Sequence, residues 1–184
     1  RGIDLIFHTA ALKHVGVSEQ TPWEAVQTNI AGVQNLISAA IENDVDKVVF
    51  TSSDKAVNPT SAMGASKLMG ERLISSAAGS SVGHKTLFVS TRFGNVLGSR
   101  GSVVPLFKQQ ISAGGPVTLT DRRMTRFVMS VSQAVELVID SVNLAGGGEV
   151  LVTKMPAVRV EDLASVMVEK LAPAFGYSPE SIRI

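Results

Sequence analysis

The chain has 184 residues, of which 45% are hydrophobic and 18% are charged, and its formal net charge is +1. This composition is that of an ordinary globular domain, and the charge gives no reason to expect nucleic acid or a membrane surface as a partner. There is no cysteine, which excludes disulfides and thiolate chemistry. His8, His14 and His84 lack the spacing of metal ligands, so we assign no metal site.

Strand-like and helix-like segments alternate along the chain. We expect strands at residues 5–9, 48–52, 86–91 and 149–153, with a short β segment at 117–120. We expect helices at residues 23–43, 62–77, 103–113, 132–145 and 160–172, and a loop at 79–84. This alternation predicts an α/β fold that forms half of a doubly wound parallel sheet.

The first residues pass at once into a core strand, so we expect the chain to be a piece of a longer protein. The G-x-G-x-x-G motif of many dinucleotide-binding sheets is absent, because Gly98 and Gly101 do not follow its pattern. If the sheet binds a dinucleotide, we therefore expect the phosphate-binding half to lie upstream of Arg1. No signal peptide is seen, and no apolar run reaches the roughly 18 residues that a membrane span needs.

The segment FTSSDKAVNPTSAMGASK, residues 50–67, holds the main group of candidate catalytic side chains. It starts at the end of an apolar strand, and Asn58-Pro59 breaks the chain before a helix that carries Lys67. Ligands of open α/β sheets bind beyond the carboxyl ends of the strands. A hydroxyl, a carboxylate and two amines at such a place indicate acid–base chemistry. A solvated turn followed by a helix cap is the simpler interpretation of this segment. For the segment as a whole, we favour a functional role.

Five motifs carry a resemblance to a known family. They are HTAALKHV (8–15), TPWEAVQTNIAGVQN (21–35), SSDKAVNPTSAMGASK (52–67), STRFGNVLGSRGSVVPLF (90–107) and VTLTDRRMTRF (117–127). They resemble the CapD-like polysaccharide biosynthesis proteins, which are extended short-chain dehydrogenase/reductases that act as nucleotide-sugar 4,6-dehydratases. The resemblance implies a Rossmann-like doubly wound sheet. Residues 1–98 would be the distal part of the NAD(P)-binding domain, and residues 99–184 mainly a small substrate-binding portion with segments that return to that domain.

The reaction that the resemblance implies uses NAD or NADP as cofactor and a UDP-sugar, typically UDP-N-acetylglucosamine, as substrate. The cofactor oxidises C4 of the sugar, water leaves across C5 and C6, and the hydride returns to C6. The resemblance also implies a cytoplasmic homo-oligomer whose full-length form is anchored at the inner membrane in some members. Two alternatives stay open, namely a C4 or C5 epimerase and a non-catalytic nucleotide-sugar-binding fragment.

The resemblance assigns catalytic roles to the 53–67 segment. Ser53 matches a residue that hydrogen-bonds the reacting hydroxyl, Asp54 the general acid at the 6-hydroxyl, and Lys55 the base at C5. The usual Tyr-x-x-x-Lys pair is Met63 and Lys67 here, and a thioether cannot take a proton. The base is therefore Asp54, a water chain, or the sugar hydroxyl relayed through Ser53 and Lys67. The simpler interpretation is that Asp54 and Lys55 only pair with each other.

Cofactor contacts are implied for residues near the first predicted strand. Ala10, Ala11 and Lys13 follow a strand whose end borders the cofactor in this superfamily. Asn29 would support Lys67, which is itself a cofactor-binding residue, through backbone and water contacts. For Lys13 and Asn29, an exposed polar residue is the simpler interpretation.

Substrate contacts are implied for the second half of the chain. Asn95 would bond the sugar or the diphosphate, and Arg126 would grip the diphosphate, with Arg100 as a second candidate. Residues 117–120, which include Thr118, resemble a β segment whose backbone reads the uracil. The remaining residues are interpreted as core (Met124, Phe127 and Met129) or as solvent-facing (Arg122 and Arg123).

Overall fold

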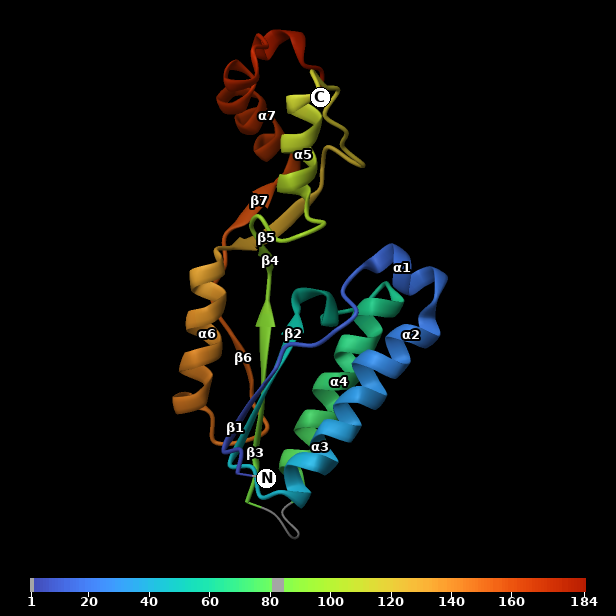
Figure 1. The fold of residues 1–184 in the computed structure, drawn as a ribbon, viewed down its shortest axis with the longest axis vertical. Coiled ribbons are helices and arrows are strands. Elements are labelled where there is room, and N and C mark those ends of the chain that lie inside the picture. The colour runs from blue at the N-terminus through green and yellow to red at the C-terminus, as the bar shows by residue number, and fades with distance from the viewer. Residues whose placement is uncertain (1, 81–84) are drawn as a thin grey trace. The chain divides into compact units, whose positions relative to one another are not determined.

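The computed structural model describes residues 2–80 and 85–184 (Figure 1). The chain forms two units: unit 1 is Arg1–Phe93 with Ser132–Thr153, and unit 2 is Gly94–Val131 with Lys154–Ile184. Of the loop expected at 79–84, residues 81–84 lie outside the described residues. In the described part of the chain, no helix is both long and apolar enough to cross a membrane.

Unit 1 is built on a parallel sheet of four strands in the order β1-β2-β3-β6. The strands are β1 (Leu5–His8), β2 (Lys47–Ser53), β3 (Leu87–Phe93) and β6 (Val150–Val152). The central strands are largely buried, as expected for parallel strands that are covered on both faces. The predicted Rossmann-like α/β sheet is confirmed.

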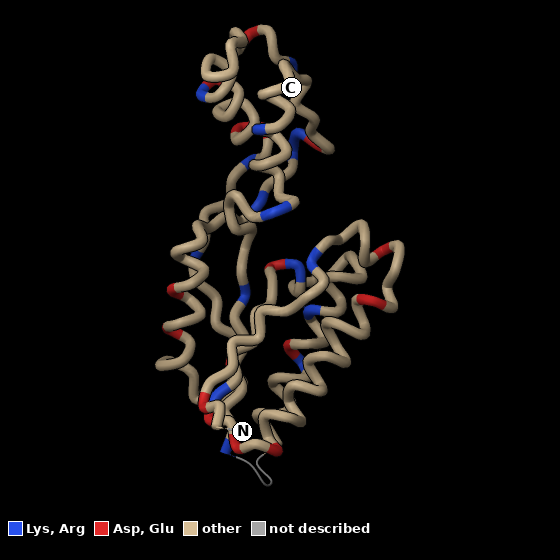
Figure 2. Tube along the Cα trace, in the orientation of Figure 1, with Lys and Arg blue, Asp and Glu red and all other residues tan. Residues whose placement is uncertain are grey.

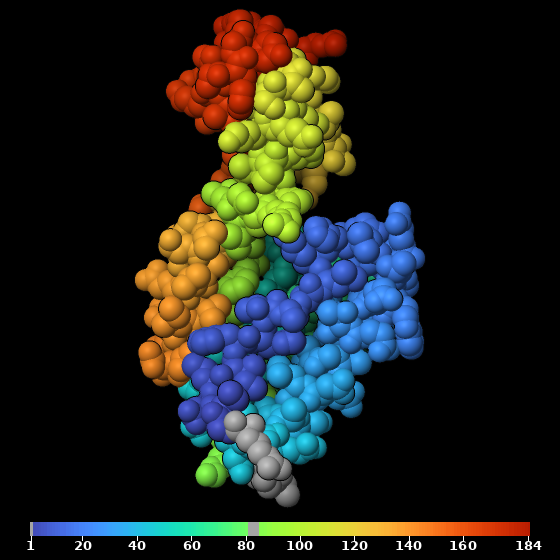
Figure 3. Space-filling view, viewed as in Figure 1, coloured from blue at the N-terminus to red at the C-terminus, as the bar shows by residue number. Residues whose placement is uncertain are grey.

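Helices cover both faces of this sheet. They are α1 (Val15–Gln20), α2 (Pro22–Val26), a π-helix η1 (Gln27–Ala31), α3 (Gly32–Glu42), α4 (Ala62–Gly79) and α6 (Val131–Leu144). Figure 1 shows α3 and α4 on one face and α6 on the other, and Figure 3 shows the surfaces of α3 and α6 on opposite flanks of unit 1. The alternation of side chains along β2 agrees: Phe50 packs with α3 and α4, whereas Val49 packs with α6.

The 23–43 segment differs in detail from the single helix that its periodicity predicts. It is helical from Pro22 to Glu42, but residues 27–31 form a π-helix within it. Such single-turn π segments insert one residue into the turn and are frequent at functional sites. The sequence analysis missed α1, because six residues are too few to show a helical period.

Helix α4 begins where its sequence provides a cap. Ser61 is the N-cap residue, and its hydroxyl accepts a hydrogen bond from the Gly64 N–H at 3.1 Å. The Glu19 carboxylate accepts a second one from the Ala62 N–H at 2.6 Å. The start of the helix is thereby fixed, and it is separated from the end of β2 by a short 3₁₀ turn, η2 (Asp54–Ala56).

Unit 2 contains a three-stranded sheet in the order β4-β5-β7. Its elements are β4 (Asn95–Val96), α5 (Val103–Ser112), β5 (Thr125–Met129), β7 (Ala157–Arg159), α7 (Val160–Leu171) and the 3₁₀ turns η3 (Pro173–Phe175) and η4 (Pro179–Ser181). Strand β5 pairs parallel with β4 and antiparallel with β7. The helices α5 and α7 bury Phe107, Ile111, Ala164 and Val168 in a separate hydrophobic core.

The β segment expected at residues 117–120 is wrong, because this stretch forms no strand. The Val117 N–H donates to the Arg183 carbonyl at 2.9 Å, whereas the Thr118 N–H donates to the Gln110 side chain at 3.2 Å. A side-chain acceptor at the second position interrupts the backbone ladder that a strand requires.

The strand of this region is β5, and the exposure of its side chains corrects a core assignment. Met129 is 2% exposed, in agreement with the prediction, but Phe127 is 50% exposed and is not a core residue. Phe127 lies two residues before Met129, so the two side chains point to the same face of the strand. The apolar character of Phe127 alone therefore did not determine its burial.

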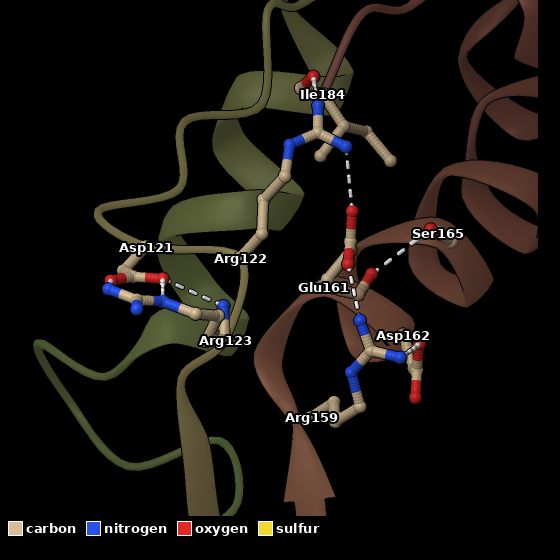
Figure 4. Close-up of polar contacts among 8 residues, drawn as sticks. All are labelled: Asp121, Arg122, Arg123, Arg159, Glu161, Asp162, Ser165 and Ile184. Carbon is tan, nitrogen blue, oxygen red and sulfur yellow. Dashed lines mark hydrogen bonds and ion pairs between the residues drawn. The ribbon is translucent and has the colours of Figure 1, made fainter.

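Ion pairs tie the 121–124 turn and β7 to α7, as Figure 4 shows. Arg122 contacts Glu161 at 2.7 Å and also donates to the carbonyl of Ile184 at 3.1 Å. Arg123 pairs with Asp121 at 2.8 Å. Both arginines are exposed, as predicted, and exposed pairs of this kind contribute little to stability.

Candidate active site

A hydroxyl, a carboxylate and an amine form one hydrogen-bonded group at the carboxyl end of β2. Ser53 Oγ donates to Asp54 Oδ1 at 2.9 Å, and Lys55 Nζ donates to the same oxygen at 3.0 Å. The Asp54 side chain is 19% exposed and that of Lys55 is 36% exposed, so both remain reachable. The structure thus shows the pairing of the simpler interpretation, and the catalytic roles of the three residues stay predictions.

The close approach of α4 holds this group in place. A Cβ atom at Gly64 would lie 2.4 Å from the Lys55 carbonyl oxygen and 3.2 Å from the Pro59 side chain. Only glycine fits against the backbone of the 3₁₀ turn at that distance, because real Cβ atoms do not come so near. The glycine therefore brings the turn that carries Asp54 and Lys55 directly onto the first turn of α4.

Lys67 is buried one and a half turns into α4, with 6% of its surface exposed. Its ammonium group donates to the Thr51 carbonyl at 2.9 Å and lies 5.0 Å from the centre of the Phe50 ring. Burial lowers the pKa of Lys67 to about 8, and the nearby negative charge of Glu71 opposes this shift. A lysine in this range can hold or release a proton near neutral pH.

Met63 precedes Lys67 by four residues on α4 and is 3% exposed. The spacing puts both side chains on one face of the helix. Its thioether supplies no proton acceptor, so the identity of the base stays among the three alternatives that the sequence left open.

His8 belongs to the same region, and the sequence analysis gave it no role. Its ring stacks on Phe50 with the centroids 5.8 Å apart and the planes at 21°. Burial lowers the pKa of His8, and the charge of Lys67 lowers it further. Phe50 thus contacts both ionisable groups, one from β1 and one from α4. The place of His8 at the end of an apolar strand is the sequence signal that could have indicated this.

Asn29 is 1% exposed, so the interpretation as an exposed polar residue is wrong. Its Oδ1 accepts from the Leu12 N–H at 2.8 Å, and its Nδ2 donates to the Leu12 carbonyl at 2.9 Å. The same Nδ2 donates to Ser66 Oγ at 2.9 Å. The π-helix therefore ties the segment that follows β1 to the residue beside Lys67.

The other predicted cofactor contacts lie in the segment that Asn29 fixes. Ala10 and Lys13 are exposed and Ala11 is half-buried. The small side chains of Ala10 and Ala11 leave the backbone accessible at these two positions, which agrees with a role in binding a flat ligand. Their contacts with a cofactor stay predictions.

An ion pair with a buried carboxylate, which the sequence did not predict, lies one helical turn beyond Lys67. Arg92 donates to Glu71 in a bidentate manner, with Nε–Oε1 at 2.8 Å and Nη2–Oε2 at 2.6 Å. Glu71 is 3% exposed, and its hydrogen bonds raise the pKa of Arg92. The spacing of four residues places Glu71 on the same face of α4 as Lys67, but no local signal in the sequence indicates Arg92 as its partner.

Unit 2 contains a pocket of about 360 Å³. Three of the four predicted substrate-binding residues line it, namely Asn95, Thr118 and Arg126, among mainly apolar side chains. Asn95 donates to the Phe127 carbonyl at 3.0 Å, and Arg126 donates to the backbone of Thr125 at 2.8 Å. The fourth residue, Arg100, is exposed and does not line the pocket.

Figure 2 shows acidic and basic residues interspersed within each unit. Among the described residues, no three His, Asp or Glu side chains are grouped so that they could hold a metal ion. The candidate sites are therefore the group at the end of β2 with Lys67 in unit 1, and the pocket of unit 2.

Comparison with protein families gives a match over residues 1–182 to the family described as polysaccharide biosynthesis protein. An uncharacterized membrane protein of Methanocaldococcus jannaschii is 54% identical, covering 99% of this chain and 55% of that protein. An inverting UDP-N-acetylglucosamine 4,6-dehydratase of Campylobacter jejuni is 43% identical, over 94% of this chain and 52% of that protein. A UDP-glucose 4-epimerase of Rickettsia akari is 46% identical, over 92% of this chain and 50% of that protein. The chain thus spans about half the length of these relatives.

Solved structures agree with the fold. The structure of Pen from Bacillus thuringiensis matches with a TM-score of 0.90 and 51% identity, covering 93% of this chain and 54% of that one. MoeE5 in complex with UDP-glucose and NAD matches with a TM-score of 0.82 and 26% identity, covering 94% and 64%. Sequence and fold therefore point to the same group of proteins.

Proposed function

The chain belongs to the polysaccharide biosynthesis protein family, and we propose that it carries the reacting residues of a UDP-N-acetylglucosamine 4,6-dehydratase. One observation carries the proposal: Ser53, Asp54 and Lys55 form a single hydrogen-bonded group at the carboxyl end of β2. A hydroxyl, an acid and an amine are the groups that removal of water from a sugar needs. The Campylobacter dehydratase among the relatives supports this choice.

The residues near Lys67 fit the nicotinamide and ribose end of NAD or NADP. An ammonium group has three donors, and the Thr51 carbonyl takes one of them, which leaves donors for ribose hydroxyls. Asn29 holds the segment of Ala10 and Ala11 in a fixed position beside it. When bound, the cofactor supplies the reversible two-electron oxidation at C4 of the sugar.

The side chains of unit 1 would then handle the protons. Ser53 Oγ would hydrogen-bond the 4-hydroxyl, and Lys67 would orient it. The 4-hydroxyl proton would pass to one of the three acceptors that the sequence leaves open, namely Asp54, a water chain, or a relay through Ser53 and Lys67. The 4-keto group acidifies the C5 proton, which a neutral Lys55 amine would take. Asp54 would act as the acid that passes a proton to the 6-hydroxyl, which leaves as water. To give the 6-deoxy product, the hydride would return to C6 and a proton exchanged with solvent, which balances the one released from the 4-hydroxyl, would be added at C5. Proton transfer across the direct contact of Lys55 and Asp54 would restore the pair.

The pocket of unit 2 would bind the nucleotide part of the substrate. Arg126 offers a permanent positive charge and paired donors for a diphosphate, and Asn95 offers an amide. Thr118 lies among the apolar lining residues that would cover a uracil ring.

We further propose a cytoplasmic homo-oligomer whose full-length form is held at the inner membrane.

A product analysis in deuterated water tests the proposed function. The full-length protein is incubated with UDP-N-acetylglucosamine, and the sugar is followed by NMR. A 4-keto-6-deoxy sugar with deuterium at C5 is the expected product. The Asp54→Asn variant should block the loss of water more than the oxidation at C4. Absence of any 6-deoxy product would refute the proposal.

An epimerase is the second candidate, because a UDP-glucose 4-epimerase is 46% identical to this chain. The oxidation at C4 is common to both reactions. An epimerase product keeps its 6-hydroxyl, so the same NMR experiment separates the two. Binding of the nucleotide sugar without turnover would instead indicate a non-catalytic binding protein.

A further inference from the structure

The Glu71–Arg92 ion pair has no role in the reaction described above, yet it lies in the same buried layer as Lys67. Lys67 and Glu71 are one turn apart on α4, with 6% and 3% of their surfaces exposed. Arg92 comes from β3, where its register partner is Ser52 of β2. The pair thus joins α4 to the two strands whose carboxyl ends border the candidate site.

Such a pair is a costly way to join a helix to a sheet. Glu71 loses most of its hydration on burial, whereas the Arg92 side chain is still 26% exposed. Apolar residues of similar size often give equal or greater stability than a buried charge pair. The short bidentate contact offsets part of that cost and leaves Glu71 as a fixed negative charge. A fixed charge beside a buried ammonium group changes how readily that group holds its proton.

We propose that Glu71, held in place by Arg92, is a positioning residue that keeps Lys67 protonated and oriented towards the carboxyl end of β2. Arg92 fixes the carboxylate in one orientation. Glu71 then stabilises the ammonium form, which burial alone destabilises. This inference rests on the proposed function, since it matters for turnover only if Lys67 takes part in the reaction.

Other groups around Lys67 do not supply this charge. From β1, His8 is stacked on Phe50, and burial and Lys67 both favour its neutral form. From β2, Lys67 meets the Thr51 carbonyl and the Phe50 ring, neither of which titrates. Asp54, beyond β2, is already hydrogen-bonded to Ser53 and Lys55. Glu71 is the carboxylate whose charge acts on Lys67.

A direct titration of Lys67 in the full-length protein tests the proposal. The protein is labelled with ¹³C-lysine, and the Lys67 signal is identified by its loss in the Lys67→Arg variant. Glu71→Gln removes the negative charge, so the Lys67 titration midpoint should move to lower pH by about one pH unit. The control Glu42→Gln, at the exposed end of α3, should leave the midpoint unchanged.

A second variant guards against misfolding of the first. Glu71→Met combined with Arg92→Met replaces the whole pair by apolar side chains, and it should fold and also lower the midpoint. An unchanged midpoint in folded variants would overturn the proposal. Failure of both variants to fold would overturn it as well, because the pair would then be needed for folding.

The pH dependence of turnover connects the titration to the reaction. If Lys67 acts as proposed, the pH profile of kcat for 6-deoxy product formation should move with the NMR midpoint in Glu71→Gln. A merely structural role of Glu71 would lower kcat at all pH values without moving the profile. If the midpoint moves but the profile does not, the charge effect stands and the reacting role of Lys67 fails.

Discussion

Replacing Asn29 should test directly how the segments around the candidate site are held together. Asn29 is buried and joins three segments of unit 1. Its side chain bonds both backbone groups of Leu12, and it also donates to Ser66 Oγ. Asn29→Ala would leave the Leu12 N–H and carbonyl without these partners. Each unsatisfied buried polar group costs about 1 to 3 kcal/mol.

The expected loss is moderate, because Leu12 is half-buried and Ser66 Oγ keeps its hydrogen bond to Met63 at 2.7 Å. We expect Asn29→Ala to destabilise the protein by about 2 to 4 kcal/mol. For a chain of this size, the melting temperature should fall by roughly 5 to 15 °C. Thermal unfolding followed by circular dichroism measures this. Hydrogen exchange should show faster exchange of the Leu12 amide.

Two further variants sharpen the test. Asn35→Ala removes an exposed amide from α3 and should change stability by less than about 0.5 kcal/mol. Asn29→Asp keeps the acceptor for the Leu12 N–H but turns an oxygen towards the Leu12 carbonyl. Its penalty should be largest at neutral pH and should shrink in acid, where a protonated carboxyl group can donate. If Asn29→Ala is as stable as Asn35→Ala, and the Leu12 amide stays protected, the reasoning is refuted.

Three other predictions follow from the site. Gly64→Ala would place a Cβ 2.4 Å from the Lys55 carbonyl oxygen, so the turn that carries Asp54 and Lys55 must shift. Turnover in the NMR assay should then fall at least tenfold. The control Ala65→Ser, on the exposed side of α4, should have little effect on turnover. The pKa of Lys67 is lowered from 10.5 to about 8 in the folded state, so between these pH values the folded state binds fewer protons than the unfolded state. The free energy of unfolding should therefore rise with pH in this range. Lys67→Met should reduce this slope by up to about 1.4 kcal/mol per pH unit, measured by urea unfolding. Arg126→Ala should weaken the binding of UDP at least tenfold by calorimetry, and unchanged affinity would exclude Arg126 from the nucleotide site.

Much of unit 1 could be predicted from the sequence because its elements have clear patterns. The strands β2 and β3 are short apolar runs that end in polar residues, and α4 follows an Asn-Pro break and a serine cap. Unit 2 was harder, because its strands have two to five residues and pair with segments distant in sequence. Strand β5 pairs with β7 some thirty residues later, and nothing local indicates that partner.

In the candidate site, too, the sequence predicts contacts between residues that are neighbours in the chain but not contacts between separate elements. The order Ser53-Asp54-Lys55 is local, so the sequence alone placed these three side chains together. The burial of Asn29 depends on a π-turn and on Leu12, which no propensity reveals. The partner of Glu71 is 21 residues away on another element. Contacts that join separate elements require the fold to be known.

Helix α4 explains why these contacts gather around Lys67. Besides the apolar Met63, Ile74 and Ala77, its buried face holds Gly64, Ser66, Lys67, Gly70 and Glu71, at positions where an ordinary core helix would bury more apolar side chains. The glycines permit close approach, since a Cβ at Gly70 would lie 2.7 Å from the Phe50 ring. Residues that break the rules of packing and are nevertheless satisfied by specific partners are expected at functional sites. The polar groups that α4 buries are therefore best understood as the support of Lys67 rather than as a means of stabilising the sheet.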